Sequence, residues 1–169
     1  ASDEQQRTSA RKKIDLFTPA PECMGAAIVP FKGDRQVVMS SLQIGDFREG
    51  FDLESGGTTT VTGSTANGNS DDDGIEVDAT GNVTITDSEA SGNYDEGFDL
   101  DAGSASVTVT DSTANDSETD DGFEVDAGSL TVTNSTANNN DDEGFQSFVS
   151  GNTLYDRVTA IGNLGDGID

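Results

Sequence analysis

The chain repeats a short acidic motif around a glycine. Residues 119–128 read "TDDGFEVDAG", and near copies stand at 94–103, "YDEGFDLDAG", and at 71–80, "DDDGIEVDAT". Each copy places at least four carboxylates within ten residues. Carboxylate and carbonyl oxygens are the ligands that Ca²⁺ prefers in proteins, so the motif indicates cation binding rather than nucleophilic chemistry.

Acids at equivalent positions of the motif would form columns if the copies stack. Equivalent residues in stacked strands lie about 4.8 Å apart. Two carboxylates at that spacing repel by roughly 1 kcal/mol in water and by about 3 kcal/mol at an effective dielectric constant of 20. Bound Ca²⁺ would offset this repulsion. We predict Ca²⁺ ligands one position before the glycine and two and four positions after it: Glu49, Asp52, Asp73, Glu76, Asp78, Glu96, Asp99, Asp101, Asp121, Glu124, Asp126 and Glu143.

Asp and Glu alternate along these columns. From Glu49 to Glu124 the copies read E-G-F-D, D-G-I-E, E-G-F-D and D-G-F-E, so long and short side chains alternate. The alternation staggers the carboxyl groups, and we expect neighbouring copies to share a cation. A solvated acidic surface, screened by salt as in halophilic proteins, accounts for the same composition and stays open as an alternative.

The rest of the composition excludes several function classes. The chain has no His, and Cys23 is its single cysteine, so no internal disulfide forms. Residues 1–50 hold seven acids and seven bases, whereas residues 51–169 hold 26 acids and one base, Arg157. A net charge of −25 excludes nucleic acid and anionic membranes as partners and favours divalent cations. No run of 18 apolar residues is present, so we expect no membrane insertion.

A repeat of 22–25 residues must position the acids. Its glycines are Gly50, Gly74, Gly97, Gly122, Gly144 and Gly167. A large apolar residue follows each glycine, and Leu or Val stands two positions later in four of the first five copies. This alternation predicts a strand with one buried face. A second strand, as in "SVTVTDSTAN" at 106–115, and polar turns complete the unit, which can bury its apolar residues only against other units.

The G-[FI]-[DE]-[LV] step and the "VTVTDSTAN" step resemble the coil repeat of the right-handed parallel β-helix, the pectin-lyase-like superfamily. The resemblance covers residues 37–169 and implies an all-β solenoid of five to six coils. We interpret residues 1–36 as an N-terminal tail and cap, with Cys23 as an inert thiol near it. We expect the repeats to be open or truncated at the C-terminal end, where a protein partner could stack on the exposed strand edge.

Enzymes, adhesins and structural modules share this fold, so fold alone leaves function open. We interpret the chain as a non-catalytic, secreted or cell-surface module that binds Ca²⁺: a rigid spacer, an adhesin or an assembly subunit. One alternative is a polysaccharide-active enzyme of lyase or epimerase type, or a fragment of one, which the resemblance implies would combine Ca²⁺ with an Arg or Lys base. A further alternative is ice binding by stacked TxT patterns such as Thr108 and Thr110.

The fifth unit, "DDEGFQSFVSGNTLYDRVTAIGN", departs from the others. Gln146 interrupts an acidic column, and Phe148 takes a position that should face outward. Exposed aromatic side chains beside an arginine could stack on a sugar or contact a protein. We therefore consider Phe148, Tyr155 and Arg157 candidate contacts for a polysaccharide or protein partner, with a local strand irregularity as the alternative.

Overall fold

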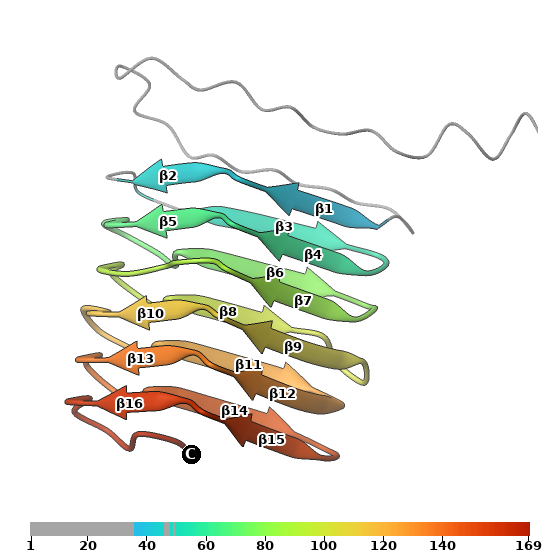
Figure 1. Cartoon of the computed structure of the whole chain (residues 1–169). Coiled ribbons are helices and arrows are strands. Elements are labelled where there is room, and N and C mark those ends of the chain that lie inside the picture. The colour runs from blue at the N-terminus through green and yellow to red at the C-terminus, as the bar shows by residue number, and fades with distance from the viewer. Residues whose placement is uncertain (1–35, 46–47, 49) are drawn as a thin grey trace, which may run out of the picture.

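The computed structural model describes residues 36–45, 48 and 50–169, and this part of the chain consists of β-strands and turns. Figure 1 shows the strands stacked as successive rungs, each strand lying above its counterpart in the next rung. The pairings are parallel, for example between β11 (Phe123–Ala127) and its neighbours β8 (Phe98–Asp101) and β14 (Phe145–Val149). The predicted all-β parallel solenoid is confirmed.

The strands form three stacks. Two are named after their outward-facing residues, and the remaining one is called the third sheet. The acidic sheet contains β3 (Phe51–Ser55), β6 (Ile75–Ala79), β8, β11 and β14. The threonine sheet contains β1 (Val37–Ser40), β4 (Thr59–Thr62), β7 (Val83–Thr86), β9 (Ser106–Thr110), β12 (Ser129–Thr133) and β15 (Thr153–Asp156). The third sheet contains β2 (Gln43–Gly45), β5 (Thr65–Asn67), β10 (Thr113–Asn115), β13 (Thr136–Asn138) and β16 (Thr159–Ile161), and single bridges through Glu89 join β5 to β10.

A narrow core fills the space between the sheets. Along β11, Phe123 and Val125 are buried, whereas Glu124 and Asp126 face outward. Phe123 stacks between two equivalent rings, with centroids 4.7 Å from Phe98 and 4.9 Å from Phe145. These distances match the spacing of neighbouring strands in a parallel sheet, so equivalent rings stack face to face. Columns of stacked apolar side chains therefore form the core of a chain that is otherwise very polar.

Glycine at the start of each acidic-sheet strand is required by the close approach of consecutive turns. A Cβ atom at Gly97 would lie 2.6 Å from the carbonyl oxygen of Gly122 and 2.7 Å from Cβ of Ala114. Any larger residue would push the rungs apart. The glycine therefore holds the acids that precede it at the rung spacing.

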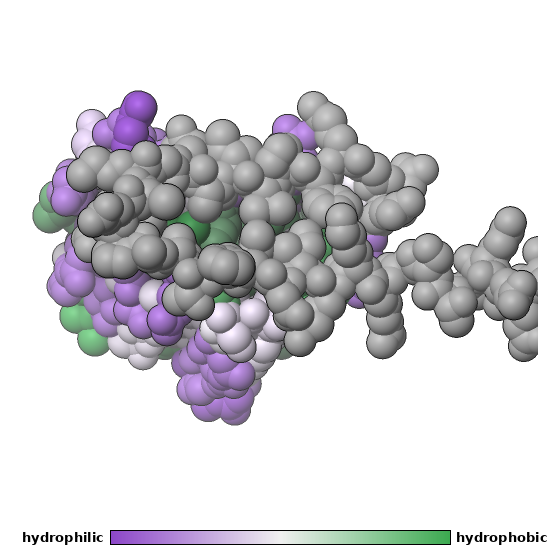
Figure 2. Space-filling view, turned by 90° about the horizontal axis from the view of Figure 1, so that it is seen from above, coloured by the Kyte–Doolittle hydropathy of each residue, from purple (hydrophilic) through white to green (hydrophobic). Residues whose placement is uncertain are grey.

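The threonine sheet carries the predicted TxT columns in register, because Thr84 pairs with Thr60 on one side and with Thr108 on the other. Figure 2, a view along the stack, shows a largely hydrophilic rim with apolar patches at a few places. Within residues 36–45, 48 and 50–169, no helix is long and apolar enough to cross a bilayer. The proposed N-terminal cap up to residue 35, Cys23 and Glu49 lie outside the described residues.

Candidate metal centre

The turns that lead from the third sheet into the acidic sheet are held in register from inside. Each begins at a buried polar residue, as at Asn69, Asn93 and Asn140. Oδ1 of Asn93 accepts the backbone N–H of Asn69 at 3.1 Å, and its Nδ2 donates to the carbonyl of Ala66 at 3.1 Å. These hydrogen bonds satisfy buried polar groups and fix consecutive turns relative to one another. Acids at equivalent turn positions therefore stack.

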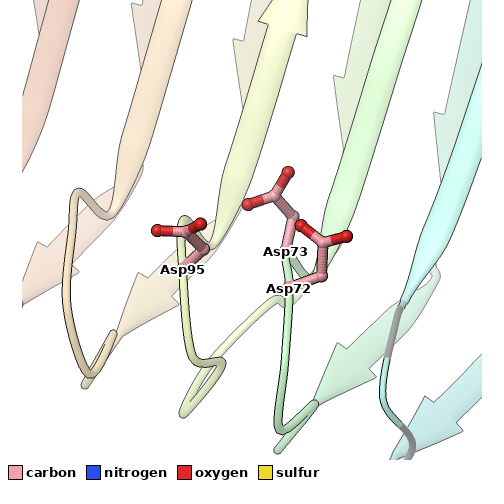
Figure 3. Close-up of side chains that lie close together, drawn as sticks. All are labelled: Asp72, Asp73 and Asp95. Carbon is pink, nitrogen blue, oxygen red and sulfur yellow. The ribbon is translucent and has the colours of Figure 1, made fainter.

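The carboxylates of consecutive turns lie close to one another. Three groups each contain oxygen atoms that all lie within 4.8 Å of one another: Asp72, Asp73 and Asp95; Asp95, Glu96 and Asp120; and Asp120, Asp121 and Asp142. Figure 3 shows Asp72 and Asp73 in one turn and Asp95 in the next. We call the acids of these three groups together the turn column. Three carboxylates from two rungs supply the all-oxygen ligands of a hard cation such as Ca²⁺.

The aspartates directly before Gly74 and Gly122 are buried. Asp73 is 8% exposed and Asp121 is fully buried at 0%. Each accepts a backbone N–H of the next rung through Oδ1, Asp73 from Glu96 at 3.0 Å and Asp121 from Glu143 at 2.7 Å. The second oxygen of Asp121, Oδ2, is buried without a hydrogen-bond partner. A buried carboxylate oxygen in this state is costly unless a proton or a cation compensates it.

The pKa values of these carboxyl groups reflect that cost. Burial raises the pKa of Asp73 to about 10, assisted by a hydrogen bond to the Glu96 side chain and by repulsion from it. Burial also raises the pKa of Asp121 to about 8; the backbone N–H of Glu143 opposes the shift, and the side chain of Glu143 adds to it. On the acidic sheet, burial and repulsion from Glu96 raise the pKa of Asp99 to about 7. Each raised pKa marks a carboxylate whose charge the protein alone does not compensate.

The acidic sheet holds the other predicted ligands in two outward columns. Strand pairing places Asp52 beside Glu76, Glu76 beside Asp99, and Asp99 beside Glu124. The second column consists of Glu54, Asp78, Asp101 and Asp126. Of the twelve residues predicted as ligands, Asp73, Glu96 and Asp121 belong to the close groups of the turn column, and Glu143 lies in the same turns. The sheet columns contribute no member to those groups within the described residues.

Four ligand candidates were missed by the sequence reasoning: Asp72, Asp95, Asp120 and Asp142. Each stands two positions before a motif glycine, in the pairs Asp-Asp-Gly and Asp-Glu-Gly. The recurrence of an acid at that position was a usable signal. Its proximity to the next turn depends on the turn conformation, which strand periodicity does not report.

The irregular fifth unit does not gather its candidate contact residues on one face. Phe148 in β14 is 55% exposed, on the outer side of the acidic sheet. The ring of Tyr155 in β15 packs inward against Phe145, with centroids 5.7 Å apart. Arg157 follows β15 in a turn with φ of 55° and pairs with Asp156 at 3.1 Å.

The comparisons with known proteins agree with this geometry. Residues 22–164 match the family described as the right handed beta helix region. The chain belongs to the right-handed β-helix family. Its fold is similar to the crystal structure of pectate lyase Pel9A, with a TM-score of 0.55, 18% identity, and coverage of 83% of this chain and 52% of the lyase. The β-helix therefore spans about half the length of that enzyme, and at this identity the likeness is one of fold. No curated protein matches the chain.

Proposed function

We propose that this chain is a non-catalytic β-helix module that binds Ca²⁺ between its rungs and serves outside the cell as a rigid spacer, adhesin or assembly subunit. The observation that carries the proposal is Asp121. Its Oδ2 is buried and has no hydrogen-bond partner. Asp121 also forms a group with Asp120 and Asp142 in which one carboxylate oxygen of each residue lies within 4.8 Å of the others. A divalent cation in this group would offset two of the three negative charges at once.

The chemistry of the group suits Ca²⁺. This ion takes six to eight oxygen ligands, and three carboxylates together with backbone carbonyls and water form such a set. Asp120 and Asp121 come from one turn and Asp142 from the next, so a bound ion would tie two rungs together. An ion that binds only the folded chain stabilises it, by about 2.7 kcal/mol at a concentration 100 times its dissociation constant.

In one turn of the described chain, an arginine side chain supplies the positive charge. Arg48 occupies the position that Asp72, Asp95 and Asp120 hold in later turns, two residues before a motif glycine. Its Nε lies 2.6 Å from Oδ2 of Asp71, in the next turn. At this end of the turn column, a guanidinium thus neutralises a carboxylate across a rung boundary. The later turns have aspartates at this position, and in the proposal a cation from solution takes the place of the guanidinium.

The non-catalytic part of the proposal rests on the placement of basic residues. In the described part of the chain these are Arg48 and Arg157, and each forms an ion pair with a carboxylate, Asp71 and Asp156 respectively. Arg157 follows a strand of the threonine sheet, whereas the turn column leads into the acidic sheet. Arg48 does stand in the turn column, but its guanidinium is paired with Asp71 of the next turn. A base that acts on a Ca²⁺-bound substrate would need to face the ion.

An extracellular location is part of the proposal because of the expected affinity. Carboxylate sites of extracellular modules bind Ca²⁺ with dissociation constants of roughly 10⁻⁴–10⁻³ M, and millimolar Ca²⁺ outside cells fills them. Fractionation of the source organism tests this part. Recovery of the protein in the cytoplasmic fraction would contradict it.

The Ca²⁺ proposal is tested by thermal unfolding at constant ionic strength. Ca²⁺ should raise the melting temperature by several degrees above the value in NaCl with chelator, as expected for a gain of about 2–3 kcal/mol. Asp121→Asn should reduce this gain by the share that its own group contributes. Asp126→Asn removes the same charge from the outward face of the same rung and should retain it. If NaCl stabilises as strongly as Ca²⁺, the acids are a screened surface and the proposal fails.

A further inference from the structure

The turn column has a period of two rungs rather than one. Turns with Asp-Asp before the glycine, at 72–73 and 120–121, alternate with turns that have Asp-Glu, at 95–96 and 142–143. The three close groups consequently differ. The first and third contain a buried aspartate, Asp73 or Asp121, whereas the middle group has the half-buried Glu96 instead.

The hydrogen bonds follow the same two-rung period. Asp73 accepts the N–H of Glu96, and Asp121 accepts the N–H of Glu143. Each bond joins an Asp-Asp turn to the Asp-Glu turn that follows it. The short aspartate side chain is thereby fixed against the next rung, with Oδ1 engaged and, in Asp121, Oδ2 left without a hydrogen-bond partner. Pairs of turns, rather than single turns, are therefore the units that form a preorganised group.

Shared ligands make the groups dependent on one another. The first and third groups have no residue in common, but the middle group shares Asp95 with the first and Asp120 with the third. Ions in neighbouring groups would lie about one strand spacing apart, roughly 4.8 Å, and would compete for the shared carboxylate. Ions in the first and third groups would lie about two spacings apart, which halves their Coulomb repulsion.

We propose that the turn column binds divalent cations at every second rung boundary, one at Asp72, Asp73 and Asp95 and one at Asp120, Asp121 and Asp142, and that the group around Glu96 holds none. This inference rests on the proposed Ca²⁺ function and adds its stoichiometry. Because the two sites share no ligand, an ion at one site takes no carboxylate from the other. The alternation of Asp and Glu along the repeat then sets the spacing of ions along the solenoid.

The experiment counts tightly bound ions on the whole chain by Ca²⁺ titration calorimetry and native mass spectrometry at constant ionic strength. The unsubstituted chain should bind two ions in its tightest class. Asp72→Asn and Asp142→Asn should each remove one, and the double variant should remove both. Glu96→Gln removes one charge from the middle group and should remove no ion. Asp142 is exposed and Asp72 is half-buried, so these substitutions preserve the fold, which circular dichroism verifies.

The outcomes separate this inference from the function on which it rests. A chain that binds no Ca²⁺ contradicts the proposed function. Three ions of equal affinity, a single ion, or the loss of an ion in Glu96→Gln would overturn the two-rung period while leaving Ca²⁺ binding intact. Loss of both ions in Asp142→Asn alone would show that the sites are coupled and would also overturn it.

Discussion

Oδ1 of Asp121 accepts the backbone N–H of Glu143 at 2.7 Å, whereas Oδ2 of the same carboxylate is buried without a hydrogen-bond partner. One oxygen therefore connects two rungs, and the other is the atom to which the proposal assigns a cation. The hydrogen bond fixes the orientation of the side chain and leaves Oδ2 free for a proton or a cation.

In the presence of a chelator, the melting temperature should be higher at pH 5 than at pH 8. Burial raises the pKa of Asp99 from its usual 3.8 to about 7. Between these values the folded chain keeps a proton that the unfolded chain has lost, so stability falls as the pH rises through this range. Burial shifts the pKa values of Asp73 and Asp121 in the same direction.

Asp99→Asn should reduce this difference between pH 5 and pH 8. Asp101→Asn is the matched control, because Asp101 is exposed on the same strand, β8, and its substitution removes the same charge. A melting temperature that is higher at pH 8 than at pH 5 in chelator would show that the raised pKa values do not govern stability.

Phe123→Ala should lower the free energy of unfolding by about 3–5 kcal/mol, because it empties the middle of a continuous aromatic stack. The Phe123 ring lies between those of Phe98 and Phe145 at centroid distances below 5 Å. Phe148→Ala is the control, since that ring is 55% exposed, and should change stability by no more than about 0.5 kcal/mol. Chemical denaturation measures both. Equal effects would contradict the assigned core.

Gly97→Ala should destabilise the chain by about 1–3 kcal/mol or more, because its Cβ would overlap the backbone of Gly122. Gly103 offers a contrast on the same rung, with φ of 52° and no atom within 4 Å of an added Cβ. Asn tolerates this left-handed conformation, so Gly103→Asn should be nearly neutral. A tolerated Gly97→Ala would mean that the turns are not in close contact.

The purified chain should release no unsaturated product from a uronate polymer in the presence of Ca²⁺. The physical reason is that Arg48 and Arg157, the basic residues of the described chain, form ion pairs with Asp71 and Asp156. Ultraviolet absorbance of the unsaturated product is the measurement, with an authentic pectate lyase as the positive control. Product formation that disappears in Arg157→Ala or Arg48→Ala would identify an enzyme instead.

The repeat was predictable because its cause is local. Alternation of Phe123, Glu124, Val125 and Asp126 requires a strand with one buried face, and near-constant spacing of the glycines requires stacking of equal units. The outward acidic columns follow from the same alternation. The order of strands in each sheet then follows from the order of the units along the chain.

The turn column was only partly predictable because it depends on how one turn lies against the next. Asp73, Glu96 and Asp121 were identified from their position before the glycine, but their partners were not: Asp72, Asp95, Asp120 and Asp142. Aspartate side chains are mostly exposed in folded proteins, yet Asp121 is fully buried. Its burial arises where consecutive turns pack closely at the glycines, a tertiary contact that sequence periodicity does not encode.

The central claim is that a divalent cation compensates the buried carboxylate of Asp121. A crystal structure of the chain grown in CaCl₂ tests it most directly, through anomalous difference density in the turn column. The claim predicts an ion at about 2.3–2.6 Å from Oδ2 of Asp121, with Asp120 and Asp142 among its ligands. A structure that has a water molecule at this position, or Ca²⁺ bound only on the outer face beside Glu124 and Asp126, would contradict it.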